Sequence, residues 1–274
     1  MRSFPKSKNE SVPLLTIDKN KNSKSVQFQI NKIVLFVAGA LLFLSGCRTR
    51  MSLSSSEKTI YPITSAQPKD SAILAYYLPY KANLDSQMNR IVAVSAIEIV
   101  KGKPEGPLNN LMADAMYDTG KFKNIPFDIA YTNSGGLRTS LPKGDILLYK
   151  VFELMPFENL MTTVKFNGAD MKLFLDYVAA SGGDPISGAR FSIKDKKAVN
   201  ITINNQPFDL NKDYTVLTSD YMANGGDGGD IFFKSKDRET YEIKLRDALL
   251  LYLEKQTKAG KILNPVNDGR ITIE

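Results

Sequence analysis

Histidine is absent from all 274 residues of the chain, and tryptophan is absent as well. Without an imidazole group the chain cannot build a histidine-based zinc site, a Ser-His-Asp triad or a Cys-His pair. Any hydrolysis would have to depend on carboxylates, lysine or tyrosine, or on groups that another chain supplies. The absence of one residue type therefore excludes most of the common hydrolytic sites.

Cysteine occurs once, at position 47, so no disulfide bond can form within the chain. The mostly apolar residues 33–46 precede it and follow Lys32, in the sequence NKIVLFVAGALLFLSGC. This run is shorter than the roughly 20 residues that span a bilayer, but it fits the apolar region of a signal peptide. Leu-Ser-Gly-Cys is similar to a bacterial lipobox, in which the thiol is acylated.

We therefore expect a lipoprotein signal peptide over residues 1–46 and a lipid attached to Cys47. The alternative is a short membrane anchor that happens to be followed by a cysteine. The expected location is a bacterial membrane, on its periplasmic or cell-surface side. A chain carrying two or three acyl groups would be held there firmly.

The positive charge of the chain lies mainly in the same leader. The formal net charge is +7, of which residues 1–46 carry +5, so only +2 remains for the rest. A basic balance concentrated in a leader does not indicate a nucleic-acid-binding surface, and we expect no nucleic-acid partner.

The remaining sequence divides into a tether and one domain. Residues 47–70 are polar, rich in serine and without periodicity, which is typical of a tether, and residues 71–274 have the composition of a globular domain. Helices and strands mix along it, with hairpins late in the chain, so the predicted fold class is α/β, in the mixed α+β sense, in a single layered domain. Helices are predicted over 71–88 (amphipathic), 107–118, 168–180 and 245–257, and strands over 91–100, 127–133, 189–193, 199–210 and 213–223.

The segment MANGGDGGDIFF, residues 222–233, allows two interpretations. It fits the glycine- and aspartate-rich repeat of calcium-binding β-rolls, and it also fits a loop that holds the hydroxyl groups of a ligand. A β-roll needs stacked repeats, because each calcium ion takes its oxygen ligands from successive turns. The pattern occurs once here, which favours the ligand-binding loop.

Three motifs extend this interpretation: YTNSGGLRTSLPKGDI (131–146), ELMPFENLMTTVKFNG (153–168) and SDYMANGGDG (219–228). In their order and spacing they resemble the C-terminal, substrate-binding domain of the 5'-nucleotidase / UDP-sugar hydrolase family, over about residues 85–265. In two-domain members a separate N-terminal metallophosphatase domain carries two metal ions on His, Asp and Asn ligands. The resemblance implies that the present domain grips a nucleoside and provides no metal ligand itself.

The resemblance assigns roles in base and ribose binding to four residues. Phe157 and Tyr221 match the two aromatic residues that stack on the faces of the base, with Tyr221 at a position where many members have Phe. Asn159 matches an amide that contacts the base edge. Asp227 matches the carboxylate that accepts hydrogen bonds from the ribose hydroxyls. Stacking of this kind stabilises any base that has a π face, and so gives little base selectivity.

Three further positions are implied with less specific roles. Asn133 and Arg138 match family positions near the nucleotide, and Arg138 would face a phosphate, which a guanidinium binds through two parallel hydrogen bonds. Gly188 matches a position where the backbone approaches the base. The family usually has one or two more arginines just before the 107–118 helix, where this chain has Lys101 and Lys103 instead. We therefore expect that this chain either binds phosphate more weakly than other family members or takes a different substrate.

These observations lead to one main hypothesis and two alternatives. The chain is predicted to be the nucleoside- or nucleotide-binding half of a split 5'-nucleotidase-type phosphohydrolase in nucleotide catabolism. A separately encoded metallophosphatase chain would complete it and carry the divalent metals, and this chain would need no cofactor of its own. The alternatives are a non-catalytic nucleotide-binding lipoprotein and a calcium-binding module built on the Gly-Asp loop.

Overall fold

The computed structural model describes residues 29, 32, 34–37, 39, 55–64 and 67–274. Cys47 and most of the expected signal peptide lie outside these residues, so lipidation stays a prediction. The chain divides into two units, Met1–Pro68 and Lys69–Glu274. Residues 55–64 of the expected tether form neither helix nor strand. Within the described part of the chain, no helix is long and apolar enough to span a bilayer.

The second unit holds helices and strands in mixed order. In sequence they are α2 (Ser71–Met88), β1 (Ile91–Ser95), α3 (Pro107–Phe122), β2 (Ile129–Tyr131), η1 (Ser134–Gly136), β3 (Gly144–Leu147), α4 (Leu148–Leu154), β4 (Leu160–Phe166), α5 (Gly168–Ala180), β5 (Ile186–Ser187), β6 (Ala189–Lys194), β7 (Lys197–Ile203), β8 (Gln206–Pro207), β9 (Tyr214–Ser219), α6 (Asp220–Ala223), η2 (Gly226–Gly228), η3 (Asp230–Lys234), β10 (Asp237–Lys244), α7 (Leu245–Lys258) and β11 (Ile271–Ile273). The α/β fold class is confirmed.

The four predicted helices are confirmed as α2, α3, α5 and α7. Local sequence explains where α5 begins, because the Asn167 side chain accepts a hydrogen bond from the Asp170 amide (2.8 Å) and so caps the first turn. Helix α2 differs from the prediction in one respect. It was expected to bury one apolar face, but none of its residues is buried within the described chain.

Several predicted strands differ in extent from the prediction, since 127–133 is reduced to β2 and 199–210 is divided into β7 and β8. Two others end at a serine. The 91–100 strand stops at Ser95, whose hydroxyl donates to the Ile97 carbonyl (2.7 Å) and offers the backbone an alternative to strand pairing. The 213–223 strand stops at Ser219, whose hydroxyl accepts from the Met222 amide (3.1 Å) and caps the short helix α6. Tyr221 therefore lies on a helical turn and not on a strand.

The central sheet has five strands in the order β10-β4-β9-β2-β5. Strands β2 and β9 run parallel, whereas β4 runs antiparallel to β9, with Met161 opposite Ser219. The carboxyl ends of β2 and β9 therefore meet the amino end of β4 at one edge of the sheet. A four-stranded sheet, β11-β6-β7-β8, and the pair β1-β3 complete the unit.

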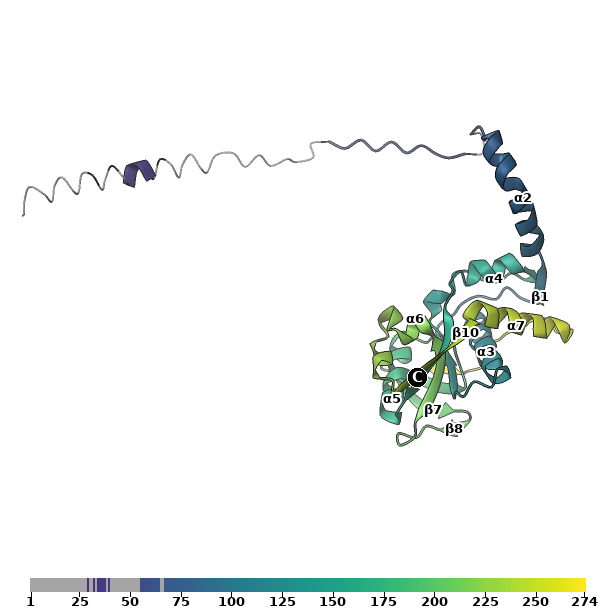
Figure 1. Ribbon diagram of the computed structural model, residues 1–274. Helices are drawn as coiled ribbons and strands as arrows, with labels where there is room; N and C mark the ends of the chain where they lie inside the picture. Colours follow the sequence, from purple (N-terminus) through teal and green to yellow (C-terminus); the bar gives the residue numbers. More distant parts are fainter. Residues whose placement is uncertain (1–28, 30–31, 33, 38, 40–54, 65–66) are drawn as a thin grey trace, which may run out of the picture. The chain divides into compact units, whose positions relative to one another are not determined.

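Side-chain alternation along the strands gives the sheet two covered faces. On β2, Ala130 belongs to a core cluster with residues of α3 and α7, whereas Ile129 and Tyr131 belong to a second cluster with residues of α5. Such alternation is the geometry of a strand buried on both sides. Figure 1 shows α5 on one side of the strands and α3 and α7 on the other.

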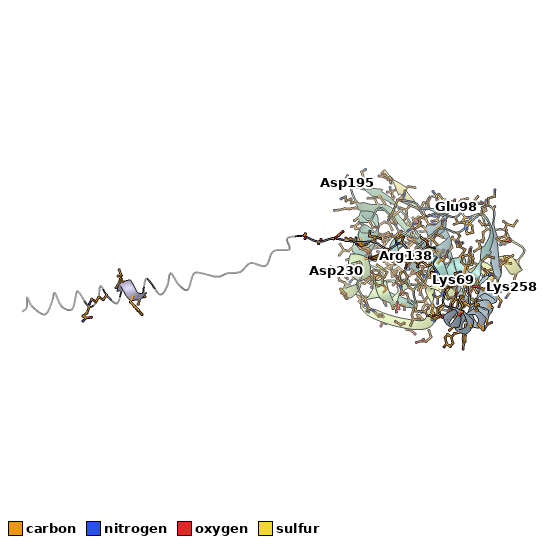
Figure 2. The ribbon with its side chains drawn as sticks, turned by 90° about the horizontal axis from the view of Figure 1, so that it is seen from above. Lys69, Glu98, Arg138, Asp195, Asp230 and Lys258 are labelled. Atoms are coloured by element: carbon orange, nitrogen blue, oxygen red, sulfur yellow. The ribbon has the colours of Figure 1, made fainter. Side chains whose placement is uncertain are left out.

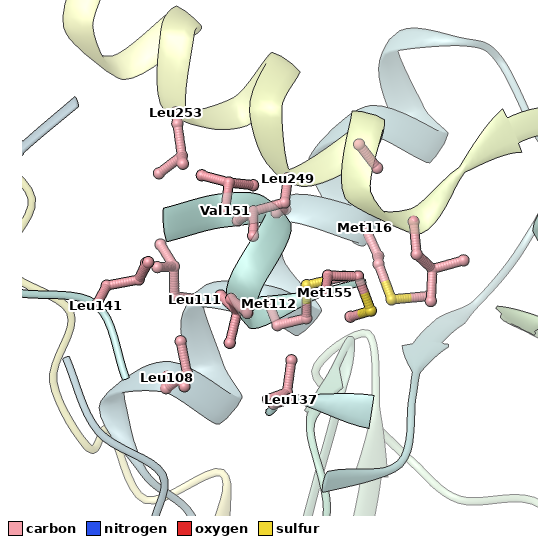
Figure 3. Packing of buried hydrophobic residues seen from close by; sticks show 14 of the residues in the cluster. Leu108, Leu111, Met112, Met116, Leu137, Leu141, Val151, Met155, Leu249 and Leu253 are labelled. Carbon is pink, nitrogen blue, oxygen red and sulfur yellow. The ribbon is translucent and has the colours of Figure 1, made fainter. Parts of the chain in front are cut away.

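The first core cluster also anchors two of the loops at the edge described above. Leu137 and Met155 are buried in it together with Leu249 of α7 (Figure 3). Leu137 follows η1 directly, and Met155 begins the connection from α4 to β4. Both loops are thus fixed from beneath by apolar packing.

Candidate functional site

The predicted site residues come from three segments that meet at the edge of the central sheet. Asn133 follows the end of β2, Tyr221 follows the end of β9, and Phe157 and Asn159 precede the start of β4. Because β4 is antiparallel to β9, its start lies beside the end of β9. Ligands of α/β sheets commonly bind beyond the carboxyl ends of parallel strands, where loops of different strands converge.

A cleft of about 290 Å³ lies at this edge. Its lining includes six of the seven residues that the sequence assigned to substrate binding. The lining residues are Asn133, Gly135, Gly136, Arg138, Phe157, Asn159, Tyr221 and Asp227. The structure thus brings these six together, while their role in binding stays a prediction.

The two aromatic rings of the cleft are open to solvent. Phe157 is 39% exposed and Tyr221 is 44% exposed, although both are large apolar side chains of a kind usually buried. Both line the same cleft. Exposed rings on the walls of one cleft are what stacking on a flat heterocycle requires.

The carboxylate of Asp227 is held between two donors. The Tyr221 hydroxyl donates to Oδ1 (2.8 Å), and the Asn133 side-chain amide donates to Oδ2. The Tyr221 oxygen also accepts from the Asp227 backbone amide (3.2 Å). A carboxylate has about four acceptor positions, so roughly two remain for the hydroxyl groups of a ligand.

Behind the carboxylate, a second tyrosine holds the backbone of Asp227. The Tyr177 hydroxyl of α5 donates to the Asp227 carbonyl (3.2 Å). Burial raises the pKa of the Tyr177 phenol, which keeps this donor protonated. Asp227 also has a φ of 51°, in the left-handed region that is costly for a residue with a side chain. The surrounding bonds fix this residue in a conformation it would seldom adopt alone.

Glycine at 226 lets the Tyr221 ring lie flat against the loop. A Cβ atom at this position would overlap the Tyr221 ring. At Gly135 a Cβ atom would lie 3.0 Å from Asp227 Oδ2 and 3.2 Å from Asn133 Nδ2. Gly226 therefore allows close approach of the Tyr221 ring, and Gly135 allows close approach of Asp227 and Asn133.

The cationic side of the cleft is formed by Arg138. Its backbone amide donates to the Leu154 carbonyl (2.9 Å), which ties it to the end of α4, and its exposed side chain donates to the Gly135 carbonyl (3.3 Å). Figure 2 labels its side chain within the domain. A guanidinium has five N–H donors, so most remain available for an anion.

The two lysines that stand where the family has arginines are engaged elsewhere. Lys103 donates to the Ser181 carbonyl (3.1 Å), the Gly183 carbonyl and the Asp184 carboxylate (3.3 Å), which uses all three of its donors. Lys101 donates to the Leu137 carbonyl (2.7 Å) and more weakly to the Ser134 carbonyl (3.4 Å).

Asp184, the partner of Lys103, organises the turn behind the site and was missed by the sequence analysis. It is buried, and its carboxylate accepts from the Ser134 amide (3.2 Å) and the Ser181 hydroxyl (2.9 Å). In the sequence it directly follows a Gly-Gly pair, and aspartate is common at turns for reasons unrelated to ligand binding. Only the fold shows that it reaches the loop that carries Asn133.

Gly188 is the predicted site residue that the structure does not bring to the cleft. It has a φ of 86°, and a Cβ atom there would lie 2.5 Å from the Asp128 carbonyl, just before β2 begins. Asn133 lies beyond the opposite end of that strand. Gly188 lines a separate cavity with Arg190 and Arg270. A glycine at this position allows close packing against β2.

The Gly-Asp loop forms two turns of 3-10 helix, η2 and η3, and not a β-roll turn. Its Asp227 carboxylate accepts from Asn133 and Tyr221. Among the described residues there is no group of three His, Cys, Asp or Glu side chains placed to hold a metal ion. The backbone of the loop thus differs from the stacked turns that the calcium interpretation requires.

Comparison with known proteins identifies the family of the domain. The family model for the "5'-nucleotidase, C-terminal domain" matches residues 70–235. This chain belongs to the 5'-nucleotidase C-terminal domain family. Among curated relatives, the 5'-nucleotidase of Vibrio parahaemolyticus is 31% identical over 175 residues, which cover 58% of this chain and 30% of the relative. A 5'-nucleotidase-related protein of Glossina morsitans morsitans is 27% identical over 237 residues, covering 75% of this chain and 42% of the relative.

Solved structures of the family share the fold. A 5'-nucleotidase precursor from Thermus thermophilus superposes with a TM-score of 0.62 at 25% identity, covering 74% of this chain and 42% of that one. The NAD nucleotidase of Haemophilus influenzae, at 20% identity, gives a TM-score of 0.58 over 75% of this chain and 41% of that one. The chain thus spans less than half the length of these 5'-nucleotidase-family proteins.

Proposed function

We propose that this chain is the nucleoside- or nucleotide-binding half of a split 5'-nucleotidase-type phosphohydrolase in nucleotide catabolism. The observation that carries the proposal is the cleft in which the exposed rings of Phe157 and Tyr221 stand beside the oriented carboxylate of Asp227. A base lies between the rings, the ribose hydroxyls donate to Asp227, and the phosphate points toward Arg138. Stacking contributes about 1–3 kcal/mol per base.

The chemistry is assigned to a second chain. A dinuclear phosphohydrolase site stabilises the attacking and the leaving oxygen with two metal ions and needs several ligands for each. This chain contains no histidine, and its described residues hold no cluster of potential ligands. In the proposal, a separately encoded metallophosphatase chain brings the divalent metals to the mouth of the cleft. Attachment of both chains to one membrane would raise their effective concentration, so that a weak interface suffices.

The arrangement of cations favours ligands with few phosphates. All three donors of Lys103 and two donors of Lys101 bond to other groups of the protein. Arg138 is therefore the main phosphate contact of the cleft in this proposal. One charge-assisted contact at an exposed site adds about 1 kcal/mol. Adenosine and AMP should therefore bind within roughly tenfold of each other, and Arg138→Ala should weaken AMP only.

The proposal is tested by titrating the chain with adenosine and with AMP while following tyrosine fluorescence, which no tryptophan obscures. Saturable quenching is expected, and a flat titration overturns the proposal. Mixing with a histidine-bearing metallophosphatase of the same family should then produce AMP hydrolysis that neither chain gives alone. Binding without any gain in hydrolysis would instead identify a non-catalytic nucleotide-binding lipoprotein.

A further inference from the structure

Arg246 is a buried cation that faces the back of the cleft wall carrying Phe157. It lies in the first turn of α7 and is 5% exposed. Its guanidinium donates from Nη1 to the carbonyls of Met155 (3.3 Å) and Phe157 (3.4 Å), and from Nη2 to the Glu158 carboxylate. One side chain thus binds three residues of the five-residue loop between α4 and β4.

The Phe157 ring is only partly packed against the protein. It is 39% exposed, it belongs to neither core cluster, and the loop around it has neither helical nor strand structure. The ends of the loop are fixed, since Met155 is buried and the Asn159 carbonyl accepts from the Leu245 amide (2.9 Å). Between these ends, the Phe157 carbonyl depends on Arg246.

The surroundings of Arg246 are built to orient a guanidinium. Its Cζ lies 4.2 Å from the centroid of the Phe152 ring, which is stacking geometry for a planar cation. Lys244 also pairs with Glu158, so the carboxylate is held from two sides. The Nε atom of Arg246 is buried without a hydrogen-bond partner within the described structure. Burying a cation costs free energy that an apolar side chain would not, which argues for a role other than stability.

We propose that Arg246 is a positioning residue for base binding, which fixes the backbone of residues 155–158 so that the Phe157 ring stays on the cleft wall opposite Tyr221. This inference rests on the proposed function, because it concerns the same base-binding cleft. Arg246 does not contact the ligand. It acts through Phe157, and the two residues should therefore be energetically coupled in binding.

A double-mutant cycle tests the coupling. Arg246→Met should weaken adenosine binding on the order of tenfold in the wild-type background, and should cause no further loss in a Phe157→Ala background. Arg246→Lys, which keeps the charge but loses the planar fork, should give an intermediate affinity. Equal losses in both backgrounds would show that Arg246 acts on the whole domain and would overturn the inference. So would an unchanged affinity of Arg246→Met beside a wild type that binds adenosine.

A gentler variant covers the case in which Arg246→Met does not fold. Glu158→Gln removes an exposed partner of Arg246 and should weaken adenosine binding about two- to threefold, again only when Phe157 is present. Glu153→Gln is the matched control, because Glu153 is an exposed glutamate whose ion pair is with Lys150 on α4 and not with Arg246 or Lys244. Equal affinities of the two variants would count against the inference. Absence of adenosine binding by the wild type would remove the proposed function itself.

Discussion

The two walls of the cleft are held in place by different means. The glycine loop at 225–229 is held by side chains that face the cleft, since Asn133 and Tyr221 both donate to Asp227. The loop at 155–159 is held from behind by Arg246, which lies 89 residues beyond Phe157 and does not line the cleft. On the first wall, residues that line the cleft supply much of the support, and Tyr177 adds a bond to the Asp227 carbonyl from behind. On the second wall, Arg246 supports the loop without lining the cleft.

This difference determines what a mutation can report. Substitution of Tyr221 or Asp227 removes a proposed ligand contact and a support together. A substitution behind the Phe157 wall removes the support alone and leaves every ligand contact in place. Changes on the first wall should therefore have the larger effects.

Removal of the Asp227 carboxylate should have the largest effect. Asp227→Ala deletes the proposed acceptor for the ribose hydroxyls and leaves the Asn133 amide and the Tyr221 hydroxyl without the Asp227 carboxylate. Hydrogen bonds to a charged group contribute about 1.5–3 kcal/mol, so adenosine affinity should fall roughly 10- to 150-fold. Isothermal titration calorimetry measures this loss. Asp230→Ala, an exposed aspartate of the next turn, is the control, and similar losses in both variants would contradict the assignment.

Truncation of the Tyr221 ring should come next. Tyr221→Ala removes one face of the proposed base sandwich and should weaken adenosine binding by about 1–3 kcal/mol. Phe122→Ala is the matched control, since Phe122 is a 70% exposed aromatic residue on α3 and does not line the cleft. If Tyr221→Ala binds adenosine as tightly as this control, the Tyr221 ring is not part of the site.

A smaller change tests whether the glycine loop sets the position of that ring. Gly226→Ala places a Cβ atom in the space of the Tyr221 ring, which must move, and adenosine affinity should fall by about 1 kcal/mol. Gly228→Ala has no atom within 4 Å of its added Cβ but strains a φ of 72°. It should lower the melting temperature without weakening adenosine binding. The reverse result would mean that the loop acts through strain and not through the ring.

The residues that line the cleft were predicted on both walls, but the support behind the Phe157 wall was not. Asn133, Tyr221 and Asp227 stand in short motifs rich in glycine, because close approach of two backbones demands glycine at fixed distances from the contact residues. Such local requirements leave a mark in a single sequence. The helices were predictable for the same reason, since capping and periodicity are local.

What escaped prediction depends on contacts between distant segments. Arg246 begins an ordinary amphipathic helix, and nothing near it in sequence indicates the loop that it binds. Gly188 was misplaced in the opposite way, because a glycine required for packing against β2 looks the same in sequence as one required beside a ligand. The exposure of α2 was missed because apolar spacing indicates a helix but not what covers it.

The smallest expected effect is a pH-dependent difference in melting temperature that reports on the support of the Phe157 wall. Hydrogen bonds from Lys244 and Arg246 lower the pKa of Glu158 to about 2. Because this pKa is depressed in the folded chain, the stabilisation is present above the usual glutamate pKa, near 4.5, and is lost as the pH falls toward 2. The melting temperature of Glu158→Gln should lie below that of the wild type at pH 6, and the gap should close between pH 4.5 and 2. Glu153→Gln provides the comparison for general acid effects, and a gap that stays constant down to pH 2 would mean that the charge of Glu158 does not hold the Phe157 wall.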